Sequence, residues 1–178
     1  PGCMATMNPF GNTLEQRHGV STPVDMYPVL ENALRARAGR SIAAHQRFLA
    51  ELMFRYSQVA ERNPFSWFPE PRTAEEIARV DARNRWIGFP YPKLMNAIME
   101  VDQGAAAIVM SESAADDLGI APERRVHFLG GASAQDGWSA AERFDLASSP
   151  AYAAAARKAQ AHAALGVADV DLFDLYSC

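Results

Sequence analysis

The chain has 178 residues, of which 49% are hydrophobic and 21% are charged, and its formal net charge is -4 at pH 7. This composition can bury a core large enough for one or two domains and is unlike that of a disordered protein. The arginines are scattered among acidic residues, which argues against a nucleic-acid-binding face. No apolar run approaches the roughly 20 residues of a membrane-spanning helix, so we expect no membrane insertion.

The cysteines and histidines indicate neither a disulfide framework nor a metal site. Cys3 and Cys178 are the two cysteines, and the four histidines show no ligand spacing. We therefore expect reduced thiols in a cytoplasmic protein, with no metal and no cofactor. The chain begins Pro1-Gly2-Cys3 without a signal-peptide pattern and stops abruptly. We expect it to be an internal segment of a longer protein.

The first part of the chain is predicted to be mainly helical. Residues 1–22 indicate an irregular loop, and a helix is expected from Thr22 to Ala38 with Gly39 as its stop signal. Ser41 is expected to cap a longer helix that ends near Asn63. An apolar stripe on this second helix suits a packed face better than a ligand pocket, and His45 is expected to pack beside it; the stripe comprises Phe48, Leu49, Leu52, Met53, Tyr56 and Val59.

The rest of the chain alternates helix and strand signals. Residues 63–72 indicate an ordered loop, Thr73 and Glu76 form a capping-box pattern, and residues 83–92 indicate a second rigid connection. Helices are expected over 114–118 and 149–165, and strands over 105–111, 125–130 and 171–176. This alternation is typical of a layered α/β domain.

Two stretches resemble the thiolase superfamily, and its sterol-carrier-protein type most. Residues 101–111, Val-Asp-Gln-Gly-Ala-Ala-Ala-Ile-Val-Met-Ser, are similar to the Asp-Gly-Ala-Ala-Ala segment that opens the carboxyl-terminal half of thiolases. Residues 166–178 are similar to the helix-turn-strand that leads into their Asn-Glu-Ala-Phe or His-Asp-Cys-Phe motif, and residues 27–38, 59–64 and 73–77 resemble their helical loop domain. The resemblance covers about residues 22–178. It implies an α/β, thiolase-like layered fold, present in part, with the helical loop domain before it.

The resemblance also implies a division of the chain and a set of partners. Residues 1–91 would comprise the end of the amino-terminal half and the helical loop domain, and residues 92–178 the first part of the carboxyl-terminal α/β domain. The nucleophilic cysteine and the Gly-His motif of thiolases would lie outside this chain. Coenzyme A and acyl-CoA would be substrates, and the protein would form a homodimer or tetramer. The aromatic residues 65–68 suggest an exposed patch for an additional protein subunit.

Cys178 matches the cysteine of His-Asp-Cys-Phe, which the resemblance implies is a second catalytic thiol that acts as acid and base. Tyr176 stands where that motif has histidine or asparagine, and Ser177 where it has aspartate or glutamate. A tyrosine hydroxyl donates one hydrogen bond and has a reference pKa of about 10, so ordinary acyl transfer is open to question. The alternative for Tyr176 and Cys178 is a buried strand end without chemistry.

The segment from Lys93 to Val101 aligns with the thiolase turn that touches the pantetheine arm. Asn96 is a candidate polar contact with substrate, with turn capping as the alternative, while Ile98 and Met99 replace small or polar side chains and predict a narrower acyl tunnel. Gly104 is expected to allow a close backbone approach. The glycine-rich turn at 130–138 lacks a phosphate-binding signature, and His127 and Trp138 near it are weaker candidates.

These residues favour a thiolase-superfamily acyl-CoA acyltransferase of lipid or sterol metabolism, catalysing 3-ketoacyl-CoA thiolysis or Claisen condensation. Two alternatives stay open. One is a CoA-binding protein that has lost its chemistry, and the other is a retro-aldol lyase acting on 3-hydroxyacyl-CoA, since a tyrosine donor suits that reaction.

Overall fold

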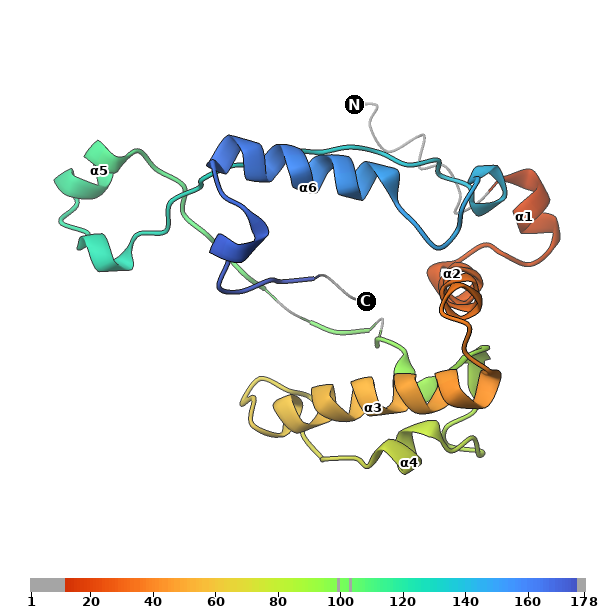
Figure 1. Ribbon diagram of the computed structural model, residues 1–178. Coiled ribbons are helices and arrows are strands. Elements are labelled where there is room, and N and C mark those ends of the chain that lie inside the picture. Colours follow the sequence, from red (N-terminus) through yellow and green to blue (C-terminus); the bar gives the residue numbers. More distant parts are fainter. Residues whose placement is uncertain (1–11, 99, 103, 176–178) are drawn as a thin grey trace, which may run out of the picture. The chain divides into compact units, whose positions relative to one another are not determined.

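The computed structural model describes residues 12–98, 100–102 and 104–175, which divide into two compact units. The described part of the first unit consists of residues 12–97 and 135–150, and that of the second consists of the intervening segment from Ile98 and residues 151–175. Figure 1 shows the helices of each unit. The predicted division into 1–91 and 92–178 stays a prediction.

The first unit opens with two helices. Helix α1, Thr13–Arg17, lies within the segment predicted to be a loop, and that prediction was wrong because Asn12 and Glu15 form a reciprocal capping box. Helix α2, Pro23–Arg37, was predicted correctly. It starts at a proline, whose fixed φ suits the first turn, and Gly39 follows it with φ of 62°.

Helix α3, Ile42–Glu61, and helix α4, Ala74–Ala78, pack side by side and hold the core of the first unit (Figure 1). Ser41 and Thr73 cap them as predicted, each accepting a hydrogen bond from the third residue of its helix. The core contains Leu49, Ala50, Ile77 and Met95. The predicted apolar stripe is buried only in part, because Phe48, Tyr56 and Val59 are exposed.

The predicted rigid connection at 83–92 contains a small antiparallel hairpin. Strand β1, Trp86–Gly88, pairs with β2, Tyr91–Pro92, around a cis peptide bond between Phe89 and Pro90. A 3-10 turn, η1 at Lys93–Met95, follows. Buried Asn84 ties this region to α4, since its Nδ2 donates to the carbonyl of Ile77 at 3.0 Å and its Oδ1 accepts from the Leu94 amide at 2.8 Å.

The remaining helices agree with the predictions. Helix α5 is Glu112–Asp117 and helix α6 is Pro150–Ala163. Three further 3-10 turns are η2 at Pro122–Arg124, η3 at Ala140–Glu142 and η4 at Val167–Asp169. Residues around Gly130 run beside α6, where a Cβ on Gly130 would stand 2.7 Å from the Ala159 carbonyl oxygen (Figure 1). None of the helices that the structure describes is both long and apolar enough to cross a membrane.

The three strands predicted over 105–111, 125–130 and 171–176 do not form among the described residues. Most of their described residues are exposed, with Val109 95% and Val126 99% exposed. A strand without a hydrogen-bonded neighbour cannot offset the entropy lost on ordering its backbone. Gly104, which was expected to allow a close approach, has no atom within 4 Å of a Cβ built on it. These segments have strand-like sequences without a partner strand in the described part of the chain.

Gly88 is the position in the hairpin where a side chain cannot fit. A Cβ there would lie 2.7 Å from the carbonyl oxygen of Val24 and 2.8 Å from Pro28 Cγ. Because both atoms belong to the rigid α2, we expect Gly88→Ala to lower the free energy of unfolding by about 2 kcal/mol. Urea denaturation measures this effect. The control is Gly104→Ala, which meets no neighbour and should change stability by less than about 0.5 kcal/mol. Equal effects at the two positions would contradict the packing of β1 on α2.

Candidate functional site

The predicted site residues fall in three groups. Tyr176, Cys178 and Met99 lie outside the described residues. Asn96 closes η1, because its Nδ2 donates to the Pro92 carbonyl at 2.9 Å, which is the geometry of the turn-capping alternative. Ile98 is half exposed, and His127 and Trp138 are exposed. The substrate-binding and catalytic roles of these residues therefore stay predictions.

A polar cluster that the sequence did not indicate joins α2, α3 and the hairpin. Glu31 Oε1 lies 2.8 Å from His45 Nε2, and the Tyr91 hydroxyl donates to Glu31 Oε2. His45 is 1% exposed, as expected of a packed residue. Burial, followed by the hydrogen bond to the Glu31 carboxylate, raises the pKa of the Tyr91 hydroxyl well above its ordinary value. Tyr91 therefore stays protonated and donates to Glu31.

The hydrogen bonds of this cluster assign a tautomer to His45. An ionised Glu31 only accepts, so Nε2 of His45 must carry the proton and donate it. Nδ1 of His45 is buried and has no hydrogen-bond partner among the described residues. The cluster is therefore suited to joining three elements rather than to passing protons to a substrate.

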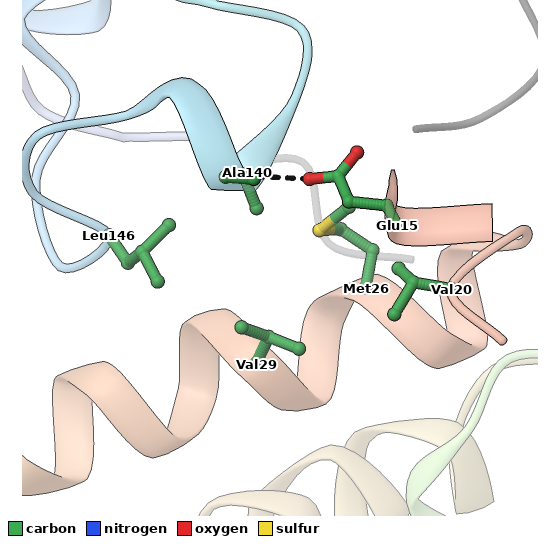
Figure 2. A pocket seen from close by; sticks show the side chains of 7 residues that line it. Glu15, Val20, Met26, Val29, Ala140 and Leu146 are labelled. Carbon is green, nitrogen blue, oxygen red and sulfur yellow. Dashed lines mark hydrogen bonds between the residues drawn. The ribbon is translucent and has the colours of Figure 1, made fainter. Parts of the chain in front are cut away.

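A buried carboxylate, that of Glu15, lines the pocket drawn in Figure 2. Glu15 Oε2 accepts from the amide of Asn12 at 2.7 Å, and Oε1 accepts from the amide of Ala141 at 2.8 Å. The pocket has a volume of about 210 Å³ and is lined by Glu15, Val20, Met26, Val29, Ala140, Ala141 and Leu146. All lining residues belong to the first unit. Glu15 thus closes one end of an otherwise apolar cavity.

The segment 135–150 forms one wall of this pocket. Arg37 of α2 binds this segment through two further contacts. Arg37 forms an ion pair with Asp145 and donates to the Ala147 carbonyl at 2.9 Å. Hydrogen bonds from the Ser148 hydroxyl, the Ala147 amide and Arg37 lower the pKa of Asp145 to about 2. Within the segment, Arg143 binds Asp136 at 3.0 Å. These contacts hold the segment against α1 and α2.

The hydrogen bond between Glu15 and Ala141 makes the binding of this segment dependent on pH. The amide of Ala141 is the largest cause that holds the pKa of Glu15 below its ordinary value of 4.5. A carboxyl whose pKa is lowered by folding stabilises the fold above its unfolded pKa, and that stability is lost as the pH falls through the folded pKa. We expect Glu15→Gln to reduce stability at pH 7, and the difference from wild type to close below about pH 4.5.

Thermal unfolding between pH 7 and pH 3 measures this difference. Glu123→Gln is the matched control, since Glu123 is exposed on η2. A stability difference between wild type and Glu15→Gln that stays constant over the whole range would contradict the ionic role of Glu15.

In the part of the chain that the structure describes, His, Cys, Asp and Glu residues form no group of three or more that could hold a metal ion. The clusters around Glu31 and Glu15 contain one carboxylate each and are saturated by hydrogen donors. The metal-free character predicted from the histidine and cysteine spacing stays a prediction for the whole protein.

Of the comparisons with known proteins, the one with solved structures found a protein similar to this chain. No protein-family model and no curated protein matches the sequence. Among solved structures, a monomeric SCP2-thiolase-like protein type 1 from Mycobacterium smegmatis matches with a TM-score of 0.78 and 38% sequence identity. The match covers 94% of this chain and 36% of that protein. This chain has part of an SCP2-thiolase-like fold.

The described residues of the second unit form no sheet, although a layered α/β fold contains one. This chain spans about a third of the length of the relative it matches, so most of a thiolase-like molecule lies outside the aligned region. The exposed segments 105–111 and 125–130 carry strand-like sequences, and a layered α/β fold buries such strands between helices. The resemblance noted from residues 101–111 and 166–178 is thus supported at the level of the fold.

Proposed function

We propose that this chain is part of a thiolase-superfamily enzyme that acts on acyl-CoA, with 3-ketoacyl-CoA thiolysis or its Claisen reverse as the reaction. The observation that carries the proposal is the match at 38% identity and a TM-score of 0.78 to an SCP2-thiolase-like protein. Cys178, aligned with the cysteine of His-Asp-Cys-Phe, supports it from the sequence. Coenzyme A is the substrate, and no further cofactor is required.

Cys178 is the residue assigned to proton transfer in this proposal. In thiolysis the carbon-carbon bond between C2 and C3 of the substrate breaks, and the leaving enolate must take up a proton. A thiol with a reference pKa of about 8.5 can give that proton and recover it from the incoming coenzyme A. The acyl group passes through a nucleophilic cysteine outside this chain. Asn96, Ile98 and Met99 remain the candidates for contact with the pantetheine arm.

The replacement of histidine by Tyr176 favours a second candidate function, a retro-aldol lyase acting on 3-hydroxyacyl-CoA. In that reaction the substrate hydroxyl loses a proton while the bond between C2 and C3 breaks, giving an aldehyde or ketone and an acyl-CoA. A tyrosine hydroxyl can take part in this proton transfer. The third candidate is a CoA-binding protein without turnover.

One substrate panel separates these candidates. The full-length protein is incubated with a 3-ketoacyl-CoA plus coenzyme A, or with a 3-hydroxyacyl-CoA alone, and calorimetry measures the binding of coenzyme A. Thiolysis supports the acyltransferase. Cleavage of the hydroxy substrate, abolished by Tyr176→Phe, supports the lyase. Binding without turnover supports the CoA-binding protein, and no binding at all would reject the thiolase assignment.

Oligomeric state and partners belong to the same proposal. The homodimer or tetramer is expected from the superfamily, whereas the solved relative is described as monomeric. Phe65, Trp67 and Phe68 are exposed, as the predicted patch for an additional subunit requires. Light scattering of the full-length protein distinguishes monomer from dimer. A cytoplasmic location remains part of the proposal.

A further inference from the structure

We infer that the pocket between α1, α2 and the segment 140–146 is a binding site for a neutral hydrocarbon group, either a single ring or the end of a short alkyl chain. Figure 2 shows its walls, with Leu146 facing Val29 across the cavity and with Val20 and Met26 toward α1. The site lies wholly within the first unit. Of the candidate substrate-binding residues that the structure describes, neither Asn96 nor Ile98 lines it.

The size of the cavity sets the size of the ligand. Its volume is about 210 Å³. An apolar protein cavity of about 150 Å³ stays dry and takes up benzene or xenon. This pocket is partly open to solvent, and its volume is enough for one ring of that size. It is smaller than the 300 to 1,000 Å³ of sites that enclose a drug-sized molecule. It therefore accepts the apolar end of a ligand.

The hydrogen bonds of Glu15 exclude a polar or anionic group. Among the described residues, Glu15 is the one charged residue that lines the pocket, and its two oxygens already accept from the amides of Asn12 and Ala141. A ligand that brought a carboxylate or phosphate into the cavity would meet a like charge and would find no donor to replace its water. The remaining lining side chains are aliphatic or thioether groups. The ligand must enter with its hydrocarbon end first.

The pocket can also adjust its shape to different bound groups. Its outer wall, 140–146, belongs to a segment that is fastened to α1 and α2 by Glu15 and Arg37. Met26, with an unbranched and polarisable side chain, can change rotamer to fit different groups. We expect occupancy of the pocket to strengthen the docking of this segment, because a ligand that binds only the folded state stabilises it.

Binding of benzene to the full-length protein tests the inference. Saturation-transfer NMR should detect benzene on wild type, and the thermal midpoint should rise with benzene concentration. Val29→Trp fills the cavity and should weaken binding by about tenfold or more. The matched control is Val59→Trp on α3, whose valine is 69% exposed and outside the pocket, and which should bind benzene like wild type.

Val29→Ala supplies a second variant in case the tryptophan disturbs α2. The smaller side chain enlarges the cavity, so naphthalene should bind this variant more tightly than wild type. The inference would be overturned if the wild type did not bind benzene. It would also be overturned if both Val29→Trp and Val29→Ala bound benzene and naphthalene as the wild type does. Benzene contains no CoA, so these results are independent of whether thiolysis is observed.

Discussion

Replacing Cys178 by alanine in the full-length protein is expected to lower the turnover of 3-ketoacyl-CoA by about 10²- to 10⁴-fold, the range for loss of a general acid or base. The reason is that the leaving enolate would no longer find a proton donor at the carbon that must be protonated. Binding of substrate depends on other contacts, so the loss is expected in kcat with little change in KM. Steady-state thiolysis followed by the loss of the 3-ketoacyl-CoA measures both constants.

Cys3→Ala is the matched control for this prediction, because Cys3 and Cys178 are the two cysteines of the chain. The control should keep the turnover of wild type. An active Cys178→Ala variant would show that the cysteine at the motif position does no chemistry, and would favour the alternative in which residues 176–178 are a buried strand end.

Replacing Glu31 by alanine is expected to lower the free energy of unfolding by about 3 kcal/mol. Glu31 accepts hydrogen bonds from His45 on α3 and from Tyr91 on β2, so its removal leaves two donors without an acceptor. His45 is 1% exposed and cannot turn to water. Urea denaturation, followed by circular dichroism of the helices, measures the loss.

Two further variants make this prediction selective. Tyr91→Phe removes one donor and keeps the ring, so it should cost about 1 kcal/mol. Glu75→Ala removes a carboxylate whose ion pair with Arg79 spans 3.7 Å on the surface of α4, and it should change stability by less than about 0.5 kcal/mol. A Glu31→Ala variant as stable as Glu75→Ala would contradict the role of the cluster as the junction of α2, α3 and the hairpin.

The helices could be predicted because their signals are local. Ser41 and Thr73 accept from amides three residues away, and Gly39 takes the left-handed conformation that a helix end favours. The one error among them was the loop prediction at 13–17. The sequence contains the same kind of local signal there. Asn12 and Glu15 are three residues apart and form a capping box, a pattern that would have indicated α1.

The strands could not be predicted by the same means. Ile108, Val109 and Val126 have strong strand preferences, yet a strand forms only where another strand lies beside it, and no local pattern supplies that neighbour. The hairpin at 86–92 forms because its two strands are close in sequence, although the sequence at 83–92 suggested only a rigid connection.

The carboxylate sites of Glu15 and Glu31 could not be predicted from the sequence, for a related reason. Glu15 binds the amide of Ala141, 126 residues away, and Glu31 binds Tyr91, 60 residues away. Glu15 belongs to the capping box of α1, but the sequence does not show that its carboxylate also binds a distant backbone amide, and Glu31 belongs to no recognisable motif. The thiolase resemblance, in contrast, rested on two contiguous stretches, 101–111 and 166–178, and the fold it implied agrees with the structural match.

The most direct test of the proposed function is a product analysis by mass spectrometry. The full-length protein is mixed with one 3-ketoacyl-CoA and free coenzyme A, and the CoA species are identified before and after incubation. The proposal predicts that the substrate is replaced by acetyl-CoA and an acyl-CoA shortened by two carbons, in equal amounts. An unchanged substrate, with the enzyme folded and the coenzyme in excess, would contradict it.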